Sequence, residues 1–180
     1  ERLETARRWI EEASADRPFR AVVVRRGRIA AEWQGGIGTD DPWRIASAAK
    51  SFYANVLGIA IAEGVIESAD TKVCDVYPEM MDVPPGRGPK GGRHARPKDR
   101  EITFRQLIGN TSGYLKPDEP PGRVWHYQTF GMNILTHAVA KAYGLYSVHD
   151  PGGSEGFSAL IRSKVAEPIG ARFDYTLTNF

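Results

Sequence analysis

Apolar positions near the start of the chain follow two different spacings. Over residues 3–13 they recur every three or four positions among charged residues, which predicts an amphipathic helix that ends before Pro18. The valine-rich stretch 19–26 predicts a buried strand, and residues 29–34 predict a second strand. Gly27 lies between them in a stretch typical of a tight turn, so we expect a β-hairpin. A hairpin is marginally stable alone, so it needs a helix or more strands to pack on.

After residue 45 the pattern is predominantly helical, and no convincing third strand is indicated. The stretch from Phe52 to Ile61 is apolar almost all round, so we expect this helix to be buried in the middle of the fold. The segments expected after it are a short helix over 68–77 ended by Pro78, a helix that starts at the capping-box pair Thr103 and Gln106, a turn at 110–114, a loop at 116–122, a helix over 132–142 closed by Gly144, a loop to Gly153, and a last helix over 157–165.

Residues 84–100 interrupt the helical pattern. They combine several prolines with four glycines and six basic residues and offer almost nothing to bury. Such a composition predicts a mobile surface loop. Binding of a phosphate or an acidic partner by this loop is the weaker alternative.

Composition restricts the function classes. With 180 residues, 41% of them hydrophobic, the chain is long enough to bury a core in one domain or two small lobes. The net charge is only +2 and many basic residues fall in one loop, so no nucleic-acid-binding stripe is indicated. A single cysteine, Cys74, excludes an internal disulfide, and four scattered histidines argue against a zinc site. No apolar run reaches membrane-spanning length, and because Glu1 begins the chain without an apolar leader, we expect any targeting peptide to have been removed.

Ser47 is the candidate nucleophile, at the point where an extended segment meets the apolar helix. At the N-terminus of that helix its own backbone N–H would be an unpaired donor, suited to a developing oxyanion. Lys50, three residues later, would lie one turn along on the same face, within reach of the serine hydroxyl. The alternative is an ordinary serine N-cap followed by a solvated lysine. This stretch alone leaves both interpretations open.

Four segments in order carry a resemblance to a known family. They are Ile45-Ala-Ser-Ala-Ala-Lys-Ser-Phe52, Ile102-Thr-Phe-Arg-Gln-Leu-Ile-Gly-Asn-Thr-Ser-Gly-Tyr114, Pro121-Gly-Arg-Val-Trp-His-Tyr127 with Asn133-Ile-Leu135, and Val165-Ala-Glu-Pro-Ile-Gly170. Together they resemble the serine β-lactamase and penicillin-binding-protein-like superfamily. The likeness is closest to its class C β-lactamase branch, which includes DD-peptidases, family VIII esterases and 6-aminohexanoate-dimer-type hydrolases.

The resemblance implies three catalytic residues. Ser47 would be acylated, Lys50 would lie beneath it, and Tyr127 would be the tyrosine of the family's Y-x-N motif. A phenol with a pKa near 10 becomes a usable base only when a nearby cation stabilises the phenolate, and Lys50 would be that cation. Without the resemblance, Tyr127 would be interpreted as an aromatic residue packed under a loop. His126 as a general base is a weaker alternative.

The chain departs from the family pattern at three places. Thr129 stands at the third position of Y-x-N, which weakens the β-lactamase and peptidase readings relative to an esterase or another amidase. Asn110 stands where the branch usually has histidine, a position that we expect to be structural. No K-T-G or H-x-G segment precedes the end at Phe180, so we expect the N-terminal part of a larger fold that needs C-terminal strands or a second chain to complete its sheet.

These observations predict an α/β (α+β) fold. Residues 1–45 would form a terminal helix and a hairpin belonging to an antiparallel sheet, and residues 46–180 the nucleophile helix and a mainly helical lobe. The expected function is hydrolysis of an ester or amide, including β-lactam or D-peptide bonds, in a small-molecule or peptide-like substrate without cofactor or metal. The alternatives are a non-catalytic binding or regulatory relative, or an inactive fragment. The resemblance favours an extracytoplasmic location.

Overall fold

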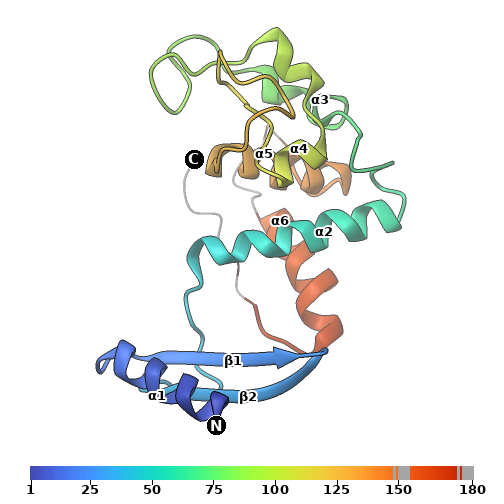
Figure 1. Cartoon of the computed structure of the whole chain (residues 1–180). Coiled ribbons are helices and arrows are strands. Elements are labelled where there is room, and N and C mark those ends of the chain that lie inside the picture. The colour runs from blue at the N-terminus through green and yellow to red at the C-terminus, as the bar shows by residue number, and fades with distance from the viewer. Residues whose placement is uncertain (148, 150–154, 174, 176–180) are drawn as a thin grey trace. The chain divides into compact units, whose positions relative to one another are not determined.

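The computed structural model of this 180-residue chain (Figure 1) describes residues 1–147, 149, 155–173 and 175. The chain divides into two compact units, Glu1–Ala46 and Ser47–Phe180. The loop expected to run to Gly153 lies largely outside the described residues. Within the described residues, no helix is both long and apolar enough to span a bilayer.

The first unit consists of one helix and one hairpin. Helix α1 (Arg2–Ser14) precedes β1 (Phe19–Arg25) and β2 (Arg28–Gly35), which pair antiparallel. Arg26 and Gly27 both have positive φ angles, 51° and 73°. Two-residue hairpin turns favour this backbone because it matches the right-handed twist of the strands. The predicted helix and hairpin are therefore confirmed. The expected burial of the first strand is wrong, because no residue of β1 is buried and Val22 and Val24 are exposed.

The second unit is mainly helical. Its elements in chain order are the 3₁₀ turn η1 (Ala46–Lys50), α2 (Ser51–Ala62), α3 (Val73–Val76), the 3₁₀ turns η2 (Pro78–Met81) and η3 (Pro97–Glu101), α4 (Phe104–Ile108), α5 (Thr129–Ala142), α6 (Glu155–Ile161), the π-turn η5 (Arg162–Ala166) and the 3₁₀ turn η6 (Glu167–Ile169). Buried side chains from α2, α4, α5 and α6 share one hydrophobic core. A helix-and-hairpin unit followed by a helical unit agrees with the expected α/β (α+β) class.

Helix α2 meets the expectation of burial on one face only. Its buried side chains are Tyr53, Val56, Leu57 and Ala60. Ala54 and Gly58, on another face, are exposed. Small residues count as apolar in the sequence pattern, yet they have little surface to bury. Helix α5 is more completely enclosed, with every residue from Met132 to Thr136 buried.

The helix expected over 68–77 is reduced to α3. The Ser68 hydroxyl accepts a hydrogen bond from the Asp70 N–H at 3.1 Å, and Lys72 forms a β-bridge with Thr103. Serine side chains compete with the helix for backbone groups in this way. The residues before Val73 are therefore a turn and a bridge, and the helix begins later than expected.

The loop expected over 84–100 ends earlier than the sequence suggests, because residues 97–101 form η3. Pro97 starts this turn, where its fixed φ is suitable and its missing N–H costs nothing. Asp99 is fully buried, and its carboxylate accepts the Arg96 N–H at 2.9 Å. The last part of the basic stretch therefore belongs to the folded unit.

The capping box before α4 and the turn after it are as expected. Thr103 and Gln106 each accept a hydrogen bond from the other's backbone N–H, at 3.3 Å and 3.0 Å. In the turn, Asn110 and Gly113 have φ angles of 55° and 58°. A Cβ atom at Gly113 would lie 2.1 Å from the Glu119 carbonyl oxygen, so only glycine fits there.

Candidate active site

Ser47 lies in η1, which runs directly into α2. Ala46 before it has a φ angle of 45°, so the chain turns sharply as the helical segment begins. The N–H groups in the first turn of a helical segment have no partner inside it. The backbone N–H of Ser47 is therefore in a position to donate a hydrogen bond outward.

Lys50 contacts Ser47 through the geometry of the 3₁₀ turn. Such a turn has three residues per repeat, so side chains at positions i and i+3 lie one above the other. The Lys50 Nζ atom donates a hydrogen bond to the Ser47 Oγ atom at 3.1 Å. The S-x-x-K spacing thus becomes a direct contact, and Lys50 is only partly exposed.

Tyr127 reaches the same place from the loop between α4 and α5. The Lys50 Nζ atom lies 5.8 Å from the centroid of the Tyr127 ring, within cation–π range. Hydrogen bonding with the Ser47 hydroxyl lowers the pKa of Tyr127 below its usual value of 10, and Lys50 and Thr129 act in the same direction. Partial burial opposes them without cancelling their effect. A hydroxyl, an ammonium and a phenol therefore meet at the start of the α2 segment.

Thr129 is the first residue of α5 and interacts with the phenol of Tyr127. It supplies one of the hydrogen bonds that lower the pKa of that phenol. The expectation that the Thr129 hydroxyl lines a substrate site stays a prediction. Its interaction with Tyr127 already engages this hydroxyl within the candidate site.

The histidines have contacts elsewhere. His126 lies with its Nδ1 atom 3.1 Å from the Glu119 carboxylate, which also pairs with Lys116. His137 is stacked on Tyr146 with ring centroids 4.7 Å apart, and burial lowers the pKa of its imidazole. These contacts give no support to a serine–histidine pair.

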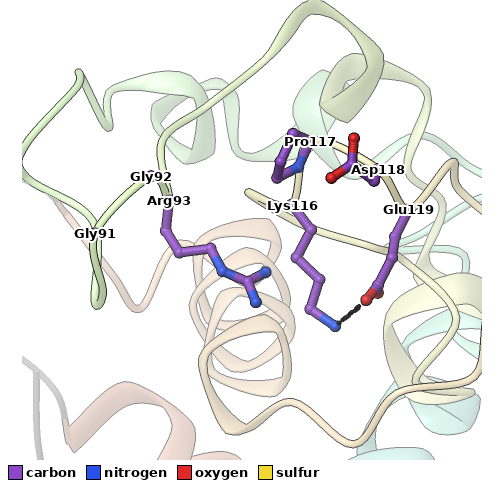
Figure 2. A pocket seen from close by; sticks show the side chains of 7 residues that line it. All are labelled: Gly91, Gly92, Arg93, Lys116, Pro117, Asp118 and Glu119. Atoms are coloured by element: carbon purple, nitrogen blue, oxygen red, sulfur yellow. Dashed lines mark hydrogen bonds and ion pairs between the residues drawn. The ribbon is translucent and has the colours of Figure 1, made fainter.

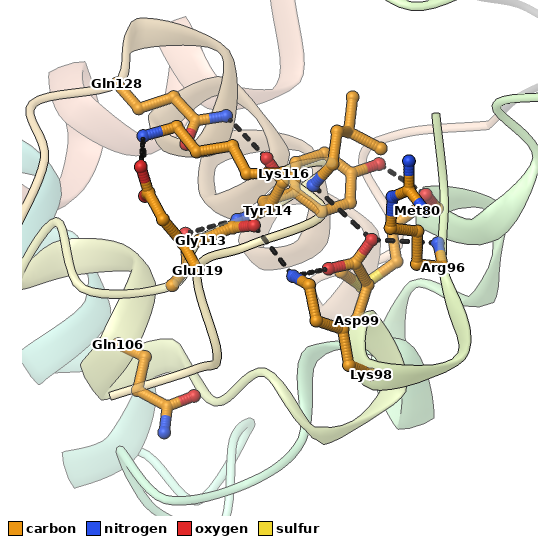
Figure 3. Close-up of polar contacts among 12 residues, drawn as sticks. Met80, Arg96, Lys98, Asp99, Gln106, Gly113, Tyr114, Lys116, Glu119 and Gln128 are labelled. Carbon is orange, nitrogen blue, oxygen red and sulfur yellow. Dashed lines mark hydrogen bonds and ion pairs between the residues drawn. The ribbon is translucent and has the colours of Figure 1, made fainter. Parts of the chain in front are cut away.

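A polar network that the sequence did not reveal supports the Tyr127 loop (Figure 3). Lys98 donates hydrogen bonds to the Asp99 carboxylate at 2.8 Å and to the Gly113 carbonyl at 2.9 Å. The Gln128 side-chain amide donates to the Tyr114 carbonyl at 2.9 Å. The sequence predicts a loop at Lys98 and Asp99, because hydrophobic periodicity marks apolar faces and says nothing about a buried carboxylate.

A recess of about 270 Å³ lies between residues 91–93 and 116–119. Figure 2 shows the side chains that line it. The Lys116 ammonium in it is almost completely buried and contacts both Glu119 oxygens, at 2.7 Å and 2.6 Å. None of the three residues that cluster at η1 lines this recess. It therefore adds no nucleophile to the candidate site.

Among the described residues, no group of three or more histidine, cysteine, aspartate or glutamate side chains is arranged to hold a metal ion. At η1, the groups brought together are a hydroxyl, an amine and a phenol.

Comparisons with known proteins agree with these motifs. The chain matches the family model described as Beta-lactamase over residues 6–175. No curated protein and no solved structure matches it. Because the family match spans almost the whole sequence, this chain belongs to the beta-lactamase family, within the serine β-lactamase and penicillin-binding-protein-like superfamily.

Proposed function

We propose that this protein is a serine hydrolase that cleaves an ester or amide bond through an acyl-enzyme on Ser47. One observation carries the proposal: the Lys50 ammonium lies 3.1 Å from the Ser47 hydroxyl and 5.8 Å from the centroid of the Tyr127 ring, so one amine contacts both groups. A serine hydroxyl is a weak nucleophile at neutral pH, and it needs an adjacent base to become reactive. The family is one of hydrolases, which agrees with this chemistry.

In the proposed reaction, the Tyr127 phenolate takes the proton from the Ser47 Oγ atom as that oxygen attacks the substrate carbonyl carbon. The Ser47 backbone N–H donates to the oxyanion of the tetrahedral intermediate. Tyr127 then protonates the departing alcohol or amine, and the acyl group stays on Ser47. A water molecule then attacks the acyl carbon while Tyr127 accepts its proton. The bond between that carbon and the Ser47 Oγ atom breaks, Tyr127 returns the proton to Oγ, and the acid product leaves.

Lys50 makes a phenol usable as this base. Its ammonium lies near both the serine oxygen and the tyrosine ring, so it favours the phenolate over the neutral phenol. Replacing Lys50 should therefore leave less phenolate on Tyr127 at a given pH.

Thr129 bears on the substrate class. A short hydroxyl that interacts with Tyr127 replaces the carboxamide of the Y-x-N motif, so an acylamide substrate loses a two-sided hydrogen-bonding partner. We therefore favour a simple ester or another linear amide over a β-lactam or a D-peptide. A non-catalytic relative that binds without turnover is the competing function.

Covalent labelling of the purified protein tests the proposal. An activated fluorophosphonate should add one adduct to the wild type, and Ser47→Ala should remove it. Ser51→Ala is the matched control, because its hydroxyl is only four residues away and bonds to the Ala48 carbonyl at 2.8 Å. A folded wild-type protein that gains no mass, even when its sheet is completed by C-terminal strands or a second chain, would reject the hydrolase and favour the non-catalytic relative.

A further inference from the structure

Asn110 holds the segment that carries Tyr127 at two points. The Asn110 carbonyl oxygen accepts a hydrogen bond from the His126 N–H at 2.8 Å. The Oδ1 atom of the same residue accepts one from the Gln128 N–H at 3.1 Å. These donors are the residues immediately before and after Tyr127, so a single asparagine fixes the backbone on both sides of the phenol.

The backbone conformation of Asn110 makes this double contact possible. Its φ angle of 55° lies in the left-handed region, where the chain reverses direction after α4. Asparagine, aspartate and glycine adopt this conformation most readily, and of these only asparagine and aspartate also present a side-chain oxygen. The residue type therefore matches both requirements of the position.

The turn that contains Asn110 is itself held firmly. The Gln128 side chain donates to the Tyr114 carbonyl at 2.9 Å (Figure 3), which adds a third connection between the turn and the Tyr127 segment. Tyr114 is fully buried and stacks on Phe130 with ring centroids 5.9 Å apart. Tyr127, in contrast, is 46% exposed, so little packing fixes it directly.

We infer that Asn110 is a positioning residue for Tyr127, whose paired backbone and side-chain acceptors hold the phenol against Ser47 and Lys50. This inference rests on the proposed function. Placement matters because a displacement of about 1 Å in a catalytic group lowers rates by roughly 10²-fold. Of the two contacts, a substitution can remove the one made by the Asn110 side chain without changing the turn.

Two variants separate the side-chain contact from the turn. Asn110→Gly retains the left-handed backbone and loses the Oδ1 acceptor, whereas Asn110→Asp retains both. We expect kcat/KM for a chromogenic short-chain ester to fall about tenfold or more in Asn110→Gly, mainly through kcat. Asn110→Asp should restore most of the rate at the pH plateau. The kcat/KM values should be compared at the pH plateau, because the added carboxylate charge by itself raises the pKa of a nearby phenol.

A second measurement does not depend on turnover. The hydroxyl pKa of Tyr127 can be followed by NMR in protein labelled with ¹³C at the tyrosine Cζ position, with Tyr127→Phe identifying the resonance. Lys50 and Tyr53 also interact electrostatically with this phenol and are unchanged in the variant. We expect Asn110→Gly to raise the Tyr127 pKa toward its ordinary value as the hydroxyl moves away from Ser47.

The outcomes distinguish the inference from the function on which it rests. An unchanged Tyr127 pKa and an unchanged rate in folded Asn110→Gly would overturn the positioning role. A wild-type protein that never acylates would overturn the hydrolase, whatever the pKa does in the variant. If Asn110→Gly does not fold, Gln128→Met loosens the same segment by removing the bond to Tyr114, and it should shift the Tyr127 pKa in the same direction.

Discussion

The Lys50 ammonium lies 3.1 Å from the Ser47 hydroxyl because one 3₁₀ turn separates the two residues. The same ammonium lies 5.8 Å from the centre of the Tyr127 ring. Lys50 therefore links a contact made within one turn to a contact made across the fold. Its charge is the feature on which the proposed chemistry depends most directly.

Replacing Lys50 with alanine should slow acylation of Ser47 by roughly 10²–10⁴-fold, because the phenolate loses the cation that stabilises it. The rate of adduct formation with an activated ester, followed by intact mass, measures this. Lys90→Ala removes an exposed lysine from a surface loop and should react at the wild-type rate. Equal rates in wild type and Lys50→Ala would refute the assigned role.

The pH dependence should report Tyr127. Hydrogen bonding with Ser47, Lys50 and Thr129 lowers the pKa of this phenol below 10. Since the deprotonated form is the base, kcat/KM should rise with pH through that lowered pKa. Tyr127→Phe should abolish this rise and slow acylation strongly, whereas Tyr143→Phe, which removes the hydroxyl that bonds Glu63, should leave it intact. A rising limb that persists in Tyr127→Phe would assign the base to another group.

Asp99→Ala should lower the free energy of unfolding by about 3 kcal/mol. The carboxylate is fully buried and accepts the N–H groups of Arg96 and Leu115 as well as the Lys98 ammonium. Its removal takes this acceptor from the Arg96 and Leu115 N–H groups, whereas Lys98 keeps its hydrogen bond to the Gly113 carbonyl. Urea unfolding measures the loss, and Asp99→Asn, which keeps one acceptor oxygen, should be less destabilised. Equal stabilities in wild type and Asp99→Ala would show that the network contributes nothing net.

The Glu119 carboxyl should make part of the stability depend on pH. Burial raises its pKa, but hydrogen bonds from Lys116 and His126 outweigh burial and hold the pKa below the usual 4.5. A group with a lowered pKa stabilises the fold fully above its unfolded value and progressively less as the pH falls below it. The stability gap between wild type and Glu119→Gln should therefore be wide near neutral pH and narrow near about pH 3.

Urea midpoints at both pH values test this prediction. Glu12→Gln, at an exposed position of α1, serves as the control for the loss of one carboxylate charge. A gap that does not change between the two pH values would mean that Glu119 stabilises the fold without its charge.

Local patterns predicted the elements well where the determinants were themselves local. The hairpin needed only Gly27 between two apolar runs, and α4 needed only the Thr103–Gln106 pair. The segment 68–77 is predicted poorly, because Ser68 bonds a local backbone N–H and Lys72 pairs with Thr103, far away in sequence. Long-range pairing of this kind leaves no periodic signal.

The residues of the candidate site also differ in whether local sequence predicts them. The contact between Ser47 and Lys50 follows from their spacing, and the segment with Tyr127 was recognised by resemblance. The residues that hold Tyr127 were not recognised as such. Asn110 was expected to be structural, but nothing in its neighbours indicates that its two oxygens accept hydrogen bonds from residues 126 and 128.

The two contacts of Lys50 differ greatly in sequence separation, and this difference has a consequence for folding. The serine and its amine come together as soon as a single turn winds, whereas the phenol arrives only when a loop some eighty residues downstream has docked. A partly folded chain would carry the first pair without its base and would be inert toward esters. Reactivity would then appear late in refolding, after most of the helix signal has been recovered.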